Sequence, residues 1–226
     1  MKYVYIIKVM KKPQFANNHF YHVFNRGTDK RKVFMDDKDY HRFLFSLRDF
    51  NDKNSSINLF RRISVSEGAV SVGSPTSHIV KKEDRESVVK FYGSCLMPNH
   101  FHLILEQLED GGISSFMQKL GTGYTNYFNQ KYERSGVLFQ GKFKAVLIDK
   151  DEYLNYLKQY IYLNPLDLFE PRWKEEGLKD WRKAKKFLEE YKWTPLKNYD
   201  EYEEFLKSCK TKSKSRFEDI KEFIIE

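Results

Sequence analysis

The sequence predicts an α+β fold in which strands and helices follow one another along one main domain. Residues 20–24, FYHVF, are strand-forming and end at an Asn-Arg-Gly turn signal. Residues 37–49 open with carboxylates and then repeat apolar side chains at three- and four-residue spacing, as an amphipathic helix does. Residues 88–92 and 100–105 flank a Met-Pro-Asn turn, so we expect them to pair as a hairpin.

The other predicted elements are read from the same signals. They are a helix from Ile113 to near Ser135, a strand-like segment over 137–148, a helix over 150–164 ending at Asn164-Pro165, short helices around 179–191 and 199–209, a strand within residues 1–12, and a long insertion at about 51–86 with little apolar periodicity. In a strand over 137–148, alternate residues share a face, so Lys142 and Lys144 would point the same way.

Composition limits the setting and the partners of the protein. The 40 Lys and Arg residues exceed the 32 Asp and Glu residues, and the net charge of +8 favours a polyanionic partner such as a nucleic acid. Two cysteines, Cys95 and Cys209, exclude a disulfide framework and a cysteine-based zinc site. The apolar run near the amino terminus is too short for a membrane span, so we expect a cytoplasmic protein with no membrane partner.

A pair of histidines is the first candidate for chemistry. His100 and His102 are two residues apart in a predicted strand, so both imidazoles project from one face and could chelate one metal ion. The strand is apolar enough to be buried on both faces, and two buried imidazoles need partners. Taken alone, a His-x-His pair in a strand is more often structural than a ligand pair.

A tyrosine and an asparagine on the helix predicted over 150–164 form the second candidate. Tyr160 and Asn164 are four residues apart and therefore lie on one helical face. If that face meets the histidine strand, three ligands and an adjacent nucleophile come together, because a phenol oxygen can attack a phosphodiester. Spacing does not choose Tyr160 over its rivals on the same helix, which are Tyr153, Tyr156 and Tyr162.

Four motifs carry a resemblance to a known family. They occur in the family's order and are YHVF followed by NRG (21–27), MPNHFHLIL (97–105), LFQGKFKA (138–145) and YIYLNP (160–165). With these motifs the chain resembles the REP-associated tyrosine transposases, which are grouped with transposases of the insertion sequence 200 type in the one-tyrosine HUH superfamily. Two departures from the family pattern are Tyr162, where many relatives have His, and Thr194-Pro195, which replaces the usual pair of serines.

The resemblance implies a fold and a site. It implies a ferredoxin-like or RRM-like antiparallel sheet carrying helices, over residues 1–166 with the insertion at about 51–86, and a C-terminal helical extension over 167–226. It also implies that His100, His102 and Asn164 bind Mg²⁺ or Mn²⁺ and that Tyr160 is the nucleophile. Imidazole and oxygen ligands suit such ions.

The resemblance also implies a substrate and a reaction. The expected partner is single-stranded DNA with a hairpin, which the protein, a monomer or a homodimer, would cleave and rejoin through a 5′-phosphotyrosine. We expect DNA contacts from four residues, which are Asn25, Arg26, Lys142 and Lys144. One alternative is a domesticated hairpin-binding protein that does not cut, and another is an unrelated metallohydrolase in which water attacks.

Overall fold

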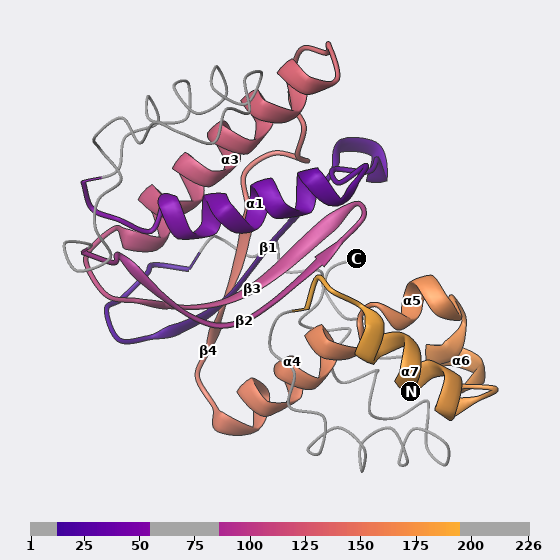
Figure 1. Ribbon diagram of the computed structural model, residues 1–226. Helices are drawn as coiled ribbons and strands as arrows, with labels where there is room; N and C mark the ends of the chain where they lie inside the picture. Colours follow the sequence, from indigo (N-terminus) through magenta and orange to yellow (C-terminus); the bar gives the residue numbers. More distant parts are fainter. Residues whose placement is uncertain (1–12, 55–85, 195–226) are drawn as a thin grey trace, which may run out of the picture.

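A four-stranded sheet lies at the centre of the protein, as seen in a computed structural model that describes residues 13–54 and 86–194 (Figure 1). Its strands are β1 (Phe20–Arg26), β2 (Val89–Met97), β3 (His100–Gln107) and β4 (Lys144–Ile148). The strand order is β2-β3-β1-β4, and each of the three pairings is antiparallel. The predicted hairpin is therefore present as β2 and β3.

Two helices cover one face of this sheet. They are α1 (Asp37–Asp49) and α3 (Gly112–Lys131), which lie together above the strands in Figure 1. The chain thus runs β1-α1-β2-β3-α3-β4, with only the short 3₁₀ turn η1 (Thr28–Lys30) between β1 and α1. This βαββαβ order, with the outer strands second and fourth, is the ferredoxin-like arrangement, so the predicted α+β class is confirmed.

The opposite face of the sheet carries the C-terminal helices. They are α4 (Asp151–Leu163), α5 (Leu166–Phe169), α6 (Trp173–Glu176) and α7 (Trp181–Glu190), grouped below the sheet in Figure 1. Their apolar side chains share one core with the sheet, since Leu157, Trp173 and Leu188 are buried in the same cluster as Ile104. The described part of the predicted C-terminal extension is helical up to Glu190 and shares this core with α4, while residues 195–226 lie outside the described residues.

Strand alternation decides which side chains face α4. On β1 and β3, Val23 and Leu103 enter the core beneath α1 and α3. His22 and His102 occupy the alternate positions and therefore point to the opposite face, the one that α4 covers. Strand alternation thus places His22 and His102 on the face of the sheet that is covered by α4, the helix that carries Tyr160.

The predicted strand over 137–148 is shorter in the structure. Only Lys144–Ile148 form β4. Phe24 of β1 pairs with Lys144, so regular pairing continued from there would place Gly27 opposite Gly141. Gly27 instead pairs with Phe139, so two extra residues bulge out, and Gly141 adopts a φ of 75° that favours glycine.

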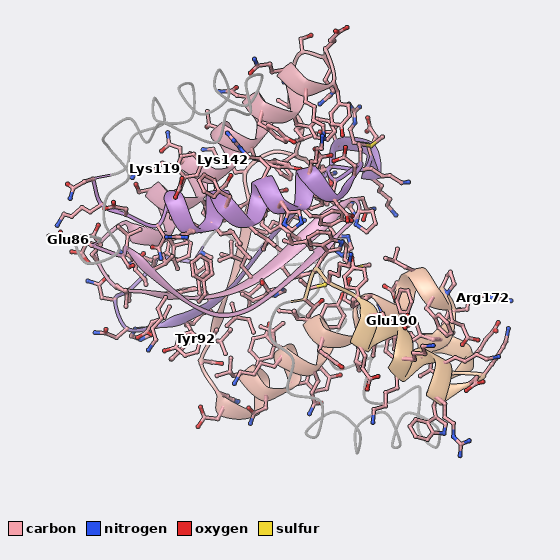
Figure 2. All side chains as sticks on the ribbon, in the orientation of Figure 1. Glu86, Tyr92, Lys119, Lys142, Arg172 and Glu190 are labelled. Atoms are coloured by element: carbon pink, nitrogen blue, oxygen red, sulfur yellow. The ribbon has the colours of Figure 1, made fainter. Side chains whose placement is uncertain are left out.

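The prediction that Lys142 and Lys144 share a face is wrong, because Lys142 lies in the bulge and Lys144 begins the regular pairing. Lys144 lines a pocket on the α4 side of the sheet, whereas Lys142 lines an open depression beside α3. Figure 2 shows Lys142 on the side covered by α1 and α3, away from Arg172 and Glu190 in the C-terminal helices. Regular alternation fails here because the bulge lies between the two pairing segments.

The C-terminal end of the described chain covers the free edge of β2. The backbone N–H of Leu96 donates to the carbonyl of Trp193 at 3.0 Å, and the Trp193 ring stacks on Tyr40 with 4.4 Å between ring centres. The Thr194 hydroxyl lies 3.3 Å from the buried Cys95 sulfur. This contact occupies the edge of the sheet at Leu96, near the end of β2, where another strand could otherwise pair.

The predicted helices agree closely with the structure. The helix expected over 37–49 is α1, the one over 150–164 is α4 with Asn164 as its C-cap, and the one over 179–191 is α7. The expected strand within 1–12, nearly all of the 51–86 insertion and the helix over 199–209 lie outside the described residues. None of the described helices is both long enough and apolar enough to cross a membrane.

Candidate active site

A pocket of about 200 Å³ opens where the ends of β1 and β3 meet α4. It contains six of the predicted site residues, while Asn164 contacts the pocket through His100 and Lys142 lies elsewhere. The lining residues are Phe24, Asn25, Arg26, Lys30, Asn99, His100, Phe101, His102, Gln140, Lys144 and Tyr160. The tertiary fold thus brings together groups that lie up to 136 positions apart in the sequence, from Phe24 to Tyr160.

His102 is held by a second histidine that the sequence reasoning did not select. The Nδ1 atom of His102 lies 2.9 Å from Nε2 of His22, whose side chain is fully buried, so one ring donates a hydrogen bond to the other. Burial lowers the pKa of His22 to about 3. The pKa of His102 is also held well below its usual value, first by burial and then by the charges of His100, His22 and Lys174.

The lowered pKa values of His22 and His102 favour the neutral rings, which is the form of histidine that can bind a metal. A depressed pKa keeps an imidazole neutral at pH 7, and a neutral imidazole has a lone pair to give to a metal. Because Nδ1 of His102 is engaged with His22, its Nε2 atom is the ring nitrogen left for a ligand. Phe24 stacks on both rings, with 4.7 Å between its centre and that of His22.

His100 faces Asn164, the C-cap residue of α4. Its Nδ1 atom lies 2.7 Å from Oδ1 of Asn99, and since a carbonyl oxygen only accepts, His100 donates there. In a neutral ring the Nε2 atom then carries a lone pair, and it lies 3.1 Å from Oδ1 of Asn164. If both atoms act as acceptors there, a cation between them would satisfy both.

The donor set fits a small divalent ion. Ligand atoms at about 2.1 Å from an octahedral ion lie about 3.0 Å from their neighbours, close to the 3.1 Å between His100 Nε2 and Asn164 Oδ1. The rings of His100 and His102 are 5.0 Å apart and nearly perpendicular. No cluster of three His, Cys, Asp or Glu side chains occurs in residues 13–54 and 86–194, so the candidate ligands are two imidazoles and an amide.

Tyr160 is the tyrosine of α4 that lines this pocket. Its ring meets the His102 ring edge-on, with centres 5.7 Å apart. The backbone N–H of Asn164 donates to the Tyr160 carbonyl at 2.9 Å, so the two residues are one helical turn apart on one face. All four tyrosines of α4 pack in the same apolar cluster, but the pocket lining does not include the three rivals, which are Tyr153, Tyr156 and Tyr162.

Cationic and amide groups surround the mouth of the pocket. The Arg26 guanidinium donates to the Gln140 side-chain oxygen at 2.6 Å, and Lys30 and Lys144 complete the basic lining. The Asn25 amide accepts from the Arg26 backbone and donates to the carbonyl of Gly141 at 3.2 Å. Asn25 therefore holds the bulge that precedes β4, while Arg26 faces the pocket.

Four residues of the site were missed by the sequence reasoning. His22 and Lys30 lie in or beside the first motif, Asn99 precedes the histidine pair, and Gln140 lies in the third motif. Polar residues inside apolar motifs could have indicated these positions, and His22 within YHVF is the clearest case. This signal was not sufficient, because only strand pairing shows that His22 faces His102.

A family model matches the part of the chain that contains most of the pocket-lining residues. The family model described as "Transposase IS200 like" matches residues 61–164, a range that includes both pocket histidines, Tyr160 and Asn164. The match confirms the resemblance to transposases of the insertion sequence 200 type that the motifs indicated. It supports a transposase-type function in binding and cleaving DNA. No curated protein matches the sequence significantly.

Solved structures give more distant similarities. A REP-associated tyrosine transposase bound to a REP hairpin aligns with a TM-score of 0.46 at 12% identity, covering 82% of this chain and 81% of that one. A candidate transposase from Deinococcus radiodurans r1 aligns at 0.33 and 14% identity, over 68% and 95% of the two chains. The tRNA(His) guanylyltransferase of Saccharomyces cerevisiae aligns at 0.33 and 11% identity, over 92% and 85%. The resemblance to the family therefore depends on the family model that matches residues 61–164, and not on these alignments.

Proposed function

We propose that this relative of the IS200-like transposases is a metal-dependent, single-stranded DNA endonuclease and strand transferase that recognises hairpin DNA and attacks it through Tyr160. The observation that carries the proposal is the meeting of the Tyr160 ring, two imidazoles and the Asn164 oxygen at one basic pocket. A protein that only bound DNA would have no need of that combination. We therefore favour cleavage over the binding-only alternative.

The residues at the mouth of the pocket would bind the substrate. Arg26 and Lys144 offer positive charge to the phosphates on either side of the scissile bond. Asn25 would contribute by holding the loop that carries Gln140. Lys142 would contact DNA only where the strand extends toward α3, because it lies on the other side of the bulge. Binding at these points would place the phosphate against the nucleophile.

The reaction follows from the position of Tyr160. Its oxygen attacks the phosphorus, so a bond to the 5′ phosphate forms while the bond to the 3′ oxygen breaks. The phenol loses its proton, and the departing strand leaves as a 3′ hydroxyl. A divalent ion held by His100, His102 and Asn164 would polarise the phosphate and stabilise charge on the leaving oxygen. Attack by a 3′ hydroxyl on the phosphotyrosine would reverse the step and rejoin DNA.

The test is a search for the covalent product. Wild type, Tyr160→Phe and Tyr156→Phe are each incubated with Mn²⁺ and a single-stranded hairpin DNA labelled at its 3′ end, then denatured and separated. We expect labelled protein with wild type and with Tyr156→Phe, because Tyr156 does not line the pocket. Tyr160→Phe should give none, since it lacks the attacking oxygen.

Each other outcome identifies a different function. Labelled protein from Tyr160→Phe would show that another group attacks. Cleaved DNA without any labelled protein, unchanged in Tyr160→Phe, would favour the metallohydrolase in which water attacks. Hairpin binding by wild type with neither product would favour the domesticated binding protein.

A further inference from the structure

A lysine from the C-terminal helices lies on the ring of the proposed nucleophile. The Lys174 ammonium, on α6, is 5.3 Å from the centre of the Tyr160 ring. Its side chain is 19% exposed, so this cation is largely withdrawn from water. A cation over an aromatic face is attracted to it, and the attraction increases as the cation loses water.

Neighbouring groups fix the position of that ammonium. It lies 2.8 Å from one carboxylate oxygen of Asp167, whose other oxygen accepts from the Trp173 indole N–H at 2.8 Å. The Trp173 ring is buried, and the backbone N–H of Asp167 donates to the carbonyl of Asn164 at 3.1 Å. Lys174 is thus tied both to the core and to the turn that carries the candidate ligand Asn164.

The Tyr160 ring is held from two directions. Lys174 lies over its face, and His102 meets it edge-on with the ring planes 88° apart. We propose that Lys174, anchored by Asp167, is a positioning residue that holds the Tyr160 ring in the orientation from which its oxygen attacks. This inference rests on the proposed function, in which Tyr160 is the nucleophile. Asp167 pairs with the ammonium and so fixes its place over the ring.

The first experiment separates positioning from binding. Lys174→Met keeps the length of the side chain and removes the cation, Lys174→Arg keeps a cation, and Lys179→Met is a matched control on an exposed lysine of the same region. Single-turnover adduct formation is measured at saturating hairpin DNA and Mn²⁺, with the Kd for DNA measured separately. We expect Lys174→Met to react about tenfold more slowly with its Kd unchanged, and Lys174→Arg to recover most of the rate.

The second experiment observes the ring without metal or DNA. Protein containing 3-fluorotyrosine is prepared for wild type and each variant, and the Tyr160 fluorine resonance is assigned by its loss in Tyr160→Phe. We expect this resonance to shift in Lys174→Met and to stay in place in Lys179→Met. Thermal unfolding is followed in parallel, and Lys174→Arg should keep the wild-type midpoint.

The outcomes distinguish this inference from the proposed function. A wild-type rate and an unmoved Tyr160 resonance in Lys174→Met would overturn the role of Lys174 while leaving the nucleophile in place. Slow reaction of both Lys174 variants, with equally lowered unfolding midpoints, would reduce the ion pair to a structural contact. If wild type forms no adduct, the proposed function fails, and the resonance shift alone then reports whether Lys174 orients the ring.

Discussion

His22 supports the candidate metal site from beneath it. Among the described residues, its Nε2 atom lies 2.9 Å from Nδ1 of His102, and its Nδ1 atom is buried with no hydrogen-bond partner. A hydrogen bond to the far nitrogen of a metal ligand fixes the tautomer and the direction of that ring. His22 therefore decides where the Nε2 atom of His102 points.

Removing that support should weaken metal binding. We expect His22→Ala to raise the Kd for Mn²⁺ about 10- to 100-fold, since losing an outer partner of a metal ligand commonly costs that much. Isothermal titration of the DNA-free protein measures it. His19→Ala is the control, because His19 is exposed and donates only to the nearby carbonyl of Asn17. An unchanged Kd in a well-folded His22→Ala protein would contradict the role of His22.

The middle of helix α3 contains two glycines, Gly121 and Gly123, with opposite surroundings. A Cβ atom added at Gly121 would meet nothing within 4 Å. A Cβ atom added at Gly123 would lie 2.6 Å from the ring of Phe50, which is buried at the end of α1. The helix therefore needs one glycine for close packing and tolerates the other.

The two glycines give a matched stability test. Gly121→Ala should raise the free energy of unfolding by about 0.5 to 1 kcal/mol, because alanine loses less backbone entropy in a helix. Gly123→Ala should lower it by about 1 to 3 kcal/mol, because its methyl group overpacks the contact between α1 and α3. Urea denaturation monitored by circular dichroism measures both. Equal effects of the two substitutions would show that the Phe50 contact is not tight.

Elements with a strong local pattern were predicted well, and the element shaped by a distant partner was not. The apolar spacing in 37–49 and 150–164 identified α1 and α4 within a residue. The segment 137–148 has strand-forming composition throughout, yet its bulge arises from how Phe139 pairs with Gly27. Pairing across more than a hundred residues leaves no local period in the sequence.

Charge acts over the whole molecule. The net charge of +8 attracts a polyanion from any direction, whereas the pocket concentrates Arg26, Lys30 and Lys144 at one place. Cations that touch phosphates displace counterions, and a salt titration counts them. Binding at the pocket can therefore be separated from general attraction.

The salt dependence of DNA binding should show this separation. We expect Lys144→Ala to reduce the slope of log K against log salt by about 0.7 for single-stranded hairpin DNA, the amount for one phosphate contact. Lys183→Ala, on an exposed lysine of α7, should leave the slope unchanged. Fluorescence anisotropy at several salt concentrations measures both. Equal slopes for all three proteins would mean that Lys144 does not touch the DNA.

The division of the chain at residue 166 stays a prediction, and the packing bears on how independent the two parts are. Trp173 and Leu188 are buried in the same cluster as Leu157 and Ile161 of α4. Lys174 also contacts the ring of Tyr160. The helices after residue 166 thus share a core with α4 and reach the Tyr160 ring through Lys174.

The sequence by itself determined the α+β class, the helices with clear periodicity, and four ordered motifs that contain the histidine pair, Tyr160 and Asn164. These features depend on local spacing, which a linear chain records directly. Only the tertiary structure decided that Tyr160 and not Tyr156 lines the pocket, that His22 contacts His102, and that Lys174 lies over the Tyr160 ring. Those choices depend on which faces of distant elements pack together, and that is set by strand register and by a bulge whose partner lies far away in the chain.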